Sequence, residues 1–445
     1  MKISKYVFLF DNKDKYFVYS SLSNSLIEID DEAYVFLKNL QESEKETDLA
    51  DLDETARDLL IQNRIVTEND EDDFLMFKAS ITQLRAQRES MHLTLAPTMQ
   101  CCFNCPYCFE KGKGGEAMPS SVMDAIVKFV ISHKELQELN LTWFGGEPLM
   151  AVRQIEEFYD KLMEQLPENV KFSSNIITSG YHLDTNAVEI LKKAKVTSIQ
   201  ITLDGLRETH NKIKNFPGCG DVFEKVIGNI EQACTLAPDI HTVIRVNLTM
   251  DNANEYPELY KFLTDKFKGK KNISIAPAFV LDRSATPAER CNSTLFSHSG
   301  RSEYILKLAS QNLDSPFLRY PRPFFTECAI RNANAVSFDP EGYAYKCWES
   351  IGNKDYAVWK LNEDGMPTDI NVKLLNRHIY GADPLEDPVC SKCKYLPLCG
   401  GGCPLQRIEN CFEGKHNPLC TFYKGYLADF MRIHIDRKEA GIYNY

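Results

Sequence analysis

Residues 98–110, TMQCCFNCPYCFE, follow an apolar run, MHLTLAP, and place four cysteines within eight positions. Cys101, Cys105 and Cys108 are spaced as C-x3-C-x2-C, whereas a structural zinc site needs four ligands, commonly as paired C-x2-C units. Three soft thiolates on one short loop suit an iron–sulfur cube in which three irons are held and one stays open. Cys102 is interpreted as a buried or incidental thiol.

The chain from residue 90 to about 280 alternates apolar strands with amphipathic helices. Repeated β-α units predict an α/β fold with a parallel sheet, open or closed towards a barrel, and chemistry on loops at the carboxyl ends of the strands. Helical spacing is clearest in residues 120–134, 151–166 and 221–234. The six strand candidates are residues 91–97, 139–146, 172–180, 196–205, 241–250 and 273–280.

The cysteine loop with its CFE ending, together with WFGGEP after the next strand, resembles the radical S-adenosylmethionine (SAM) superfamily. The resemblance implies a partial (β/α)6 barrel, in agreement with the six strands. It also implies that Cys101, Cys105 and Cys108 hold a [4Fe–4S] cluster whose open iron chelates SAM. Reductive cleavage of SAM then yields a 5′-deoxyadenosyl radical that takes a hydrogen atom from the substrate, while the protein positions and shields the reaction.

The family's SAM contacts carry over to the positions that match its motifs. Tyr107 resembles the aromatic residue near the adenine, and Thr202 stands where the family often has serine. Lys214 stands where related enzymes often have arginine, so a charge remains but the planar fork is lost. In GGEP the glycines let the backbone approach SAM, and the carboxylate can accept from its ammonium group. The expected SAM contacts are Tyr107, Gly145, Gly146, Glu147, Thr202, Lys214 and Asn247.

A second group of cysteines resembles the seven-cysteine pattern of the SPASM domain, which in related enzymes holds two auxiliary [4Fe–4S] clusters. The spacing is long and constrained, so a chance match is improbable. A pair of zinc sites is the alternative, and metal analysis separates the two readings, because three cubes contain about twelve irons. The resemblance assigns Cys328, Cys347 and Cys403 to the first auxiliary cluster, and Cys390, Cys393, Cys399 and Cys420 to the second.

The first auxiliary cluster is one ligand short in this assignment. Either Cys291 or Cys411 completes it, or the iron stays open for a substrate thiolate. Cys219 and Cys234 are expected to be core thiols. The sequence leaves the fourth ligand undecided.

The N-terminal region has a different pattern. The runs YVFLF and YFVYSS, separated by DNKDK, predict a hairpin, and residues 24–40 and 52–66 carry helical spacing. The acidic residues 67–73 are expected to form a solvated linker at the exit. This order resembles the small winged-helix-like peptide-binding module of pyrroloquinoline quinone synthesis, which implies that a leader peptide binds as an added strand. The alternative is a packing domain that covers the open side of the barrel.

Three domains are therefore expected: a peptide-recognition module over 1–80, a radical SAM core over 88–312 and a Cys-rich SPASM domain over 313–445. The formal net charge of -12 argues against nucleic-acid binding, which favours basic surface. No apolar stretch reaches the 18 or so residues of a membrane span, so a cytoplasmic protein is expected.

SPASM relatives modify proteins or ribosomal peptides, and one branch, the anaerobic sulfatase-maturing enzymes, has a catalytic Asp directly after the second SPASM cysteine. Here Cys347 is followed by Trp348. The expected function is therefore a maturase that installs a thioether or carbon–carbon cross-link in a ribosomal precursor peptide, with a flavodoxin or ferredoxin as electron donor. A sulfatase-type maturase and a non-catalytic iron–sulfur scaffold are the alternatives. No histidine or carboxylate has a spacing that identifies a catalytic base, and the oligomeric state is not indicated.

Overall fold

The computed structural model describes residues 1–43, 53–110, 112, 114–281, 295–313, 320–323 and 328–442. Packing divides the chain into two compact units, each with its own core. The first unit comprises Met1–Ala86, His298–Cys328 and Tyr380–Tyr445, and the second comprises Gln87–Ser297 and Ala329–Ile379.

The second unit is built on one ten-stranded sheet. Six of its strands run parallel, and each pairs with the next in chain order, as repeated β-α units require. All six predicted strands are confirmed, and the result is the partial (β/α)6 barrel expected for the fold class. The six strands are β6 (Ser90–Leu95), β7 (Glu138–Trp143), β8 (Lys171–Thr178), β9 (Val196–Leu203), β10 (His241–Leu248) and β11 (Ile273–Phe279).

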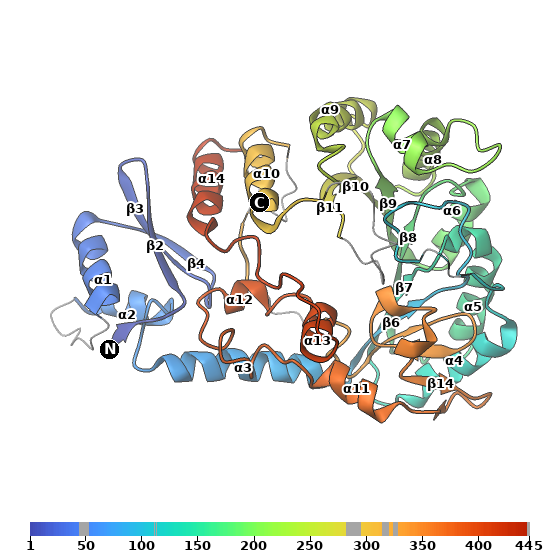
Figure 1. Cartoon of the computed structure of the whole chain (residues 1–445), viewed down its shortest axis with the longest axis horizontal. Coiled ribbons are helices and arrows are strands. Elements are labelled where there is room, and N and C mark those ends of the chain that lie inside the picture. Colours follow the sequence, from blue (N-terminus) through green and yellow to red (C-terminus); the bar gives the residue numbers. More distant parts are fainter. Residues whose placement is uncertain are drawn as a thin grey trace. The chain divides into compact units, whose positions relative to one another are not determined.

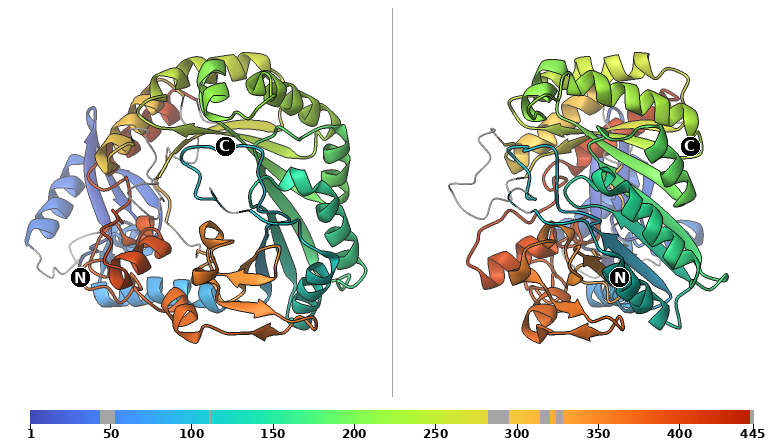
Figure 2. Two further views of the ribbon diagram at one scale, coloured as in Figure 1. Left: turned by 45° about the vertical axis from the view of Figure 1, so that its right-hand side comes forward. Right: turned by 90° about the vertical axis from the view of Figure 1, so that its right-hand side faces the viewer.

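Helices cover the outer face of this curved sheet (Figure 2). Their apolar sides are buried, as in α8, where Val226, Ile227 and Ile230 are almost fully covered. Aspartates begin two of them: Asp184 and Asp221 accept backbone hydrogen bonds from the first turns of α6 and α8. The helices are α4 (Ser120–Ser132), α5 (Val152–Met163), α6 (Thr185–Lys193), α7 (Arg207–Ile213), α8 (Val222–Leu236) and α9 (Tyr256–Lys266).

The sheet continues past β6 with strands from the Cys-rich part of the sequence. β12 (Ala335–Phe338) pairs in parallel with β6, and a short antiparallel extension follows it. The sequence pattern did not indicate this pairing, because the strands are only two to four residues long. The extension is β13 (Tyr343–Tyr345), β14 (Trp359–Leu361) and β15 (Pro367–Thr368), followed by α11 (Val372–Ile379).

The first unit begins with a three-stranded antiparallel sheet in the order β2-β3-β4, drawn in blue in Figure 1. β2 (Val7–Asn12) and β3 (Lys15–Ser20) form the predicted hairpin. The helical spacing predicted for residues 24–40 is wrong in its first part, since Ser25–Ile29 form β4 against β3. The β-branched residues of SLIEI favour a strand once a neighbouring strand is available.

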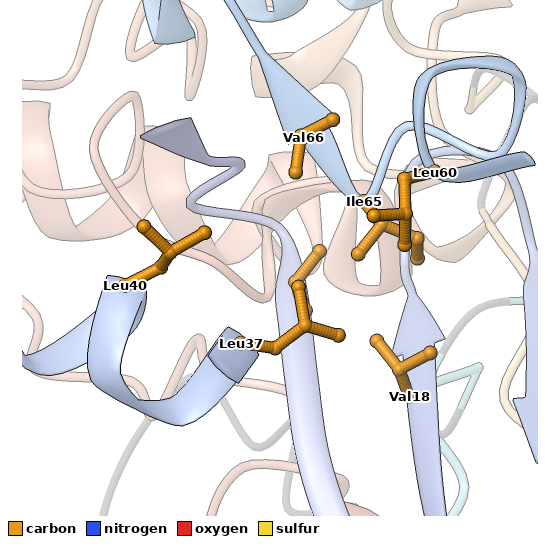
Figure 3. Packing of buried hydrophobic residues seen from close by; sticks show 7 residues of the cluster. Val18, Leu37, Leu40, Leu60, Ile65 and Val66 are labelled. Atoms are coloured by element: carbon orange, nitrogen blue, oxygen red, sulfur yellow. The ribbon is translucent and has the colours of Figure 1, made fainter. Parts of the chain in front are cut away.

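Two helices pack on this sheet. Leu37 and Leu40 of α1 (Asp31–Ser43) and Leu60 of α2 (Glu54–Gln62) are buried beside Val18 (Figure 3). Asp53 caps α2 through a hydrogen bond from the backbone of Ala56. A second small pairing joins β1 (Lys2–Ile3) to β5 (Val66–Thr67).

The acidic residues 67–73 are not a solvated linker, contrary to the prediction. They run into α3 (Asp70–Ala86), whose acidic first turn is favourable to the helix dipole. Asp73 is 1% exposed and accepts a hydrogen bond of 2.7 Å from Ser4 Oγ. Arg64 lies 3.7 Å from the same carboxylate. The acidic run is therefore partly a structural contact.

The remaining helices of the first unit come from its C-terminal segments. The Ser302 hydroxyl donates to the Phe422 carbonyl at 2.6 Å, which ties two of these segments together. No helix within the described ranges is long and apolar enough to cross a membrane. The helices are α10 (His298–Ser310), α12 (Leu396–Cys399), α13 (Pro404–Phe412) and α14 (Leu427–Glu439).

Candidate active site

A pocket of about 310 Å³ opens in the second unit, lined mainly by loops and strand ends on the carboxyl side of the parallel sheet. All three predicted ligands of the primary cluster line it, whereas Cys102 does not. The structure also brings every expected SAM contact to this one pocket: Tyr107, Gly145, Gly146, Glu147, Thr202, Lys214 and Asn247.

The three thiols of the loop have different environments. Burial raises the pKa of Cys105, and it raises the pKa of Cys108 to about 12. A hydrogen bond from Cys102 instead lowers the pKa of Cys101 to about 7. Because iron binds the thiolate, cluster assembly has to draw a proton from the two buried thiols.

Soft thiolates beside a pocket of this size fit the implied [4Fe–4S] cluster with SAM. In the described part of the chain, no three cysteine, histidine or carboxylate groups converge as they do around a single metal ion. A cluster does not require such convergence, because each thiolate binds a different iron, whereas the four ligands of a zinc ion must surround one point.

The GGEP turn packs directly on the cysteine loop. Gly145 has a φ of +111°, and a Cβ there would lie 2.5 Å from the Thr98 carbonyl oxygen. A Cβ on Gly146 would lie 2.3 Å from the Gln100 carbonyl oxygen. The Glu147 amide donates to that same oxygen at 2.8 Å. Only glycine allows this approach, so both glycines are required for the loops to pack together.

The Glu147 carboxylate is 1% exposed and is surrounded by hydrogen-bond donors of the chain. It accepts from Thr178 Oγ1 at 2.6 Å, from the Ser179 amide at 2.9 Å and from the Leu149 amide at 3.1 Å, with a further bond from the Ser179 hydroxyl. These four bonds use the acceptor sites of a carboxylate. The predicted contact with the SAM ammonium therefore has to share an acceptor already in use.

Asp204 is the centre of a buried polar network that the sequence did not identify. Tyr107 donates its hydroxyl to Asp204, and Lys214 Nζ lies 3.5 Å from the same carboxylate. Lys214 Nζ is also 3.5 Å from Cys105 Sγ. The Asp204 amide donates to His210 Nδ1 at 3.2 Å. The network connects the end of β9 to the cysteine loop.

The groups of this network stabilise the positive charge on Lys214. Burial alone would lower the pKa of Lys214. The charges of Asp204, Tyr107 and Cys105 act in the opposite direction and outweigh burial, so the pKa of Lys214 is raised well above its usual value. Burial lowers the pKa of His210 to about 4, so this histidine is neutral near pH 7. The ammonium group is thus charged and directed at a cluster thiolate.

Arg245 is a second residue that the sequence analysis missed. It lines the pocket from β10, paired in register with Thr202 of β9. The available signal was its position two residues before Asn247, because alternate residues of a strand share one face.

One wall of the pocket is aromatic. The rings of Phe109 and Phe144 stack with centroids 6.1 Å apart, and Trp348 stacks on the other side of Phe144 at 5.7 Å. Trp348 remains 45% exposed. The residue after Cys347 therefore faces the pocket in this chain.

The predicted auxiliary cysteines lie in both units. Cys347 belongs to the second unit, and Cys328 and Cys403 to the first. Cys411 is exposed on α13, and Cys291 lies outside the described residues. The fourth ligand of the first auxiliary cluster stays open.

The four cysteines predicted for the second auxiliary cluster all belong to the first unit. Burial raises the pKa of Cys399, and the nearby thiols of Cys420 and Cys390 add to this rise. Cys393 acts in the same way on Cys390. Cys399 is thus close enough to Cys420 and Cys390 for their charges to act on it, and Cys390 is close enough to Cys393.

Known proteins give the same class for the chain. Residues 95–263 match the Radical SAM superfamily. The chain is 24% identical over 380 residues to a cysteine-type anaerobic sulfatase-maturating enzyme of Clostridium perfringens, covering 73% of this chain and 91% of that protein. It is 26% identical over 238 residues to the radical SAM cyclopropyl synthase TigE of Paramaledivibacter caminithermalis, covering 47% and 50%.

A solved structure, native anSMEcpe with bound AdoMet and the Kp18Cys peptide, has a similar fold. The TM-score is 0.58 at 20% identity, over 79% of this chain and 99% of that one. Fold, pocket and sequence together define a radical SAM enzyme, whose cofactors are a [4Fe–4S] cluster and SAM. The chain carries the Radical SAM domain and is homologous, over most of its length, to enzymes named as maturases of sulfatases.

Proposed function

We propose that the chain is a radical SAM maturase that installs an intramolecular cross-link, thioether or carbon–carbon, in a ribosomally synthesised peptide. The observation that carries the proposal is Trp348. It lines the pocket at the position where the sulfatase-maturing branch has its catalytic Asp. An indole cannot take a proton as a carboxylate does, so the proton-abstracting group of that branch is missing at this position.

When bound, the cluster and SAM supply the radical that removes a hydrogen atom from the substrate. The residues of the chain position and shield that reaction. Cys101, Cys105 and Cys108 would hold the cluster, and the glycines of GGEP would admit SAM beside it. Phe109, Phe144 and Trp348 would contact the substrate and exclude water from its reacting side chain.

The N-terminal sheet supports a peptide substrate. Its outer strands are β2 and β4. β2 is partly covered, because Arg432 Nε donates to the Asp11 carbonyl at 2.8 Å and Asn12 Nδ2 donates to Asp436 at 2.9 Å. β4 has no further strand partner among the residues that the structure describes. We assign β4 (Ser25–Ile29) as the edge to which a leader peptide adds as a strand.

A sulfatase-type maturase is the second candidate, favoured by the relatives that match most of the chain. Co-expression with candidate precursor peptides, taken from short open reading frames that neighbour the gene, followed by mass spectrometry, separates the two functions. A cross-link removes two hydrogens and leaves no aldehyde. A formylglycine product, detected with an aldehyde-reactive hydrazide, would support the second candidate and overturn the first. Co-expression with Cys101→Ala, which should leave the peptide unmodified, is the control.

A further inference from the structure

Arg245 is a cation that has no carboxylate partner in the part of the chain that the structure describes. Its side chain is half-buried in β10 and lines the pocket. Its Nε donates to Asn247 Oδ1 at 3.1 Å. Throughout the described ranges, no aspartate or glutamate forms an ion pair with its guanidinium. Burial lowers the pKa of Arg245, and only the more distant Tyr107 opposes this effect.

A cation placed in this way is costly unless a ligand pairs with it. Arginine stays charged in proteins, so the cost is not relieved by loss of a proton. The terminal nitrogens of Arg245 have no hydrogen bond within the described part of the chain, and the residue lines the pocket. A bidentate anion would satisfy them, and a carboxylate has that geometry.

Lys214, the expected SAM contact that stands where related enzymes often have arginine, is already engaged. Its ammonium lies 3.5 Å from Asp204 and 3.5 Å from Cys105 Sγ, and it is 6% exposed. The ammonium therefore neutralises Asp204 and faces a cluster thiolate. Two of the three donors of the ammonium group thus face groups of the chain, which leaves at most one for a second anion.

We propose that Arg245 binds the aminoacyl carboxylate of SAM, with Asn247 as the residue that positions it. Thr202, another expected SAM contact, is the register partner of Arg245 on the adjacent strand, and its hydroxyl can donate to the same carboxylate. The planar fork that is missing at position 214 is thus supplied from β10. Lys214 acts on the cluster side of the pocket. The proposal depends on the radical SAM class alone and not on the peptide substrate.

The test compares SAM with decarboxylated SAM, by isothermal titration calorimetry on anaerobic, oxidised protein that carries its clusters. Arg245→Gln should weaken SAM binding by about tenfold to hundredfold, because a charge-assisted bidentate pair is lost. The affinity for decarboxylated SAM should stay within about twofold of wild type, because it has no carboxylate to pair. The matched control is Arg153→Gln, at an exposed position on α5.

Two results would overturn the proposal. One is a SAM affinity of Arg245→Gln within about twofold of wild type. The other is an equal loss for both ligands, which would show that Arg245 only shapes the pocket. Iron content and the far-ultraviolet circular dichroism spectrum establish that the variant is intact. If Arg245→Gln loses iron, Arg245→Lys is measured instead: it keeps the charge without the fork and should weaken SAM alone, by a smaller factor.

Discussion

At Glu147 a single carboxylate joins three segments of the site. Its two oxygens accept hydrogen bonds from three places: the turn that begins at Pro148, the end of β8, and the loop that follows β8. The residue thus holds GGEP in place through hydrogen bonds within the chain. This is a structural function for a residue that the motif alone would assign to the ligand.

Glu147→Gln should lower the free energy of unfolding by about 2 kcal/mol, since hydrogen bonds to a charged acceptor contribute roughly 1.5–3 kcal/mol and the new amide would face the Ser179 amide. Urea unfolding under anaerobic conditions measures the change. Glu157→Gln, at an exposed position on α5, is the matched control and should cost at most about 0.5 kcal/mol. Equal effects at both positions would contradict the structural assignment of Glu147.

His378 is 1% exposed, and burial lowers its pKa to about 4, with Lys346 and Arg331 acting in the same direction. The folded pKa lies below the unfolded value of about 6.5, so its stabilising effect is complete above that pH and is lost as pH falls towards 4. Because of this residue, the free energy of unfolding should fall by about 2 kcal/mol as the pH is lowered from about 7 to about 5. Urea unfolding of His378→Gln should show a correspondingly weaker pH dependence, and His416→Gln, at an exposed position, is the control. An unchanged pH dependence in His378→Gln would count against the assignment.

At the scale of the elements, the contact between GGEP and the cysteine loop leaves no room for an added methyl group. Gly146→Ala places a Cβ against the Gln100 carbonyl, which is backbone and cannot rotate away. The two loops should separate, with SAM affinity reduced about tenfold or more and the iron of the primary cluster partly lost. Gly228→Ala in α8, where a Cβ meets nothing within 4 Å, should leave both unchanged. Calorimetry with SAM and iron analysis measure the pair; wild-type binding by Gly146→Ala would show that the contact is dispensable.

The elements also show what the sequence can and cannot predict. The six parallel strands and the loop cysteines could be predicted, because apolar runs and thiol spacing are local features. β4 and β12 to β15 were missed or misassigned, because such short strands depend on neighbours distant in sequence. The acidic start of α3 was missed for a related reason: the partner of Asp73 is Ser4, 69 residues away.

In the candidate site too, local features could be predicted from the sequence and long-range contacts could not. Residues in dense motifs, such as Tyr107 and Gly145, could be placed in the pocket from sequence. Asp204, which directly follows β9, and Arg245 in β10 were missed, because a single charged residue does not indicate which partners the fold gives it; only the spacing to Asn247 indicated the face of Arg245. Lys214 was placed correctly in the pocket, but its pairing with Asp204 required the fold.

The whole molecule combines a radical SAM barrel with a Cys-rich segment and an N-terminal sheet. The central claim is that the pocket beside Cys101, Cys105 and Cys108 cleaves SAM reductively. Every other inference about substrate or auxiliary clusters depends on that reaction. It can be measured without knowledge of the peptide, because SAM itself is the molecule that is cleaved.

The most direct measurement is the anaerobic incubation of purified, cluster-containing protein with SAM and dithionite, followed by quantification of 5′-deoxyadenosine. The account predicts that wild-type protein forms 5′-deoxyadenosine and that Cys101→Ala forms none, while Cys102→Ala, at the neighbouring thiol outside the pocket lining, still forms it. Equal formation by wild-type protein and Cys101→Ala, or none by wild-type protein with its iron in place, would contradict the account.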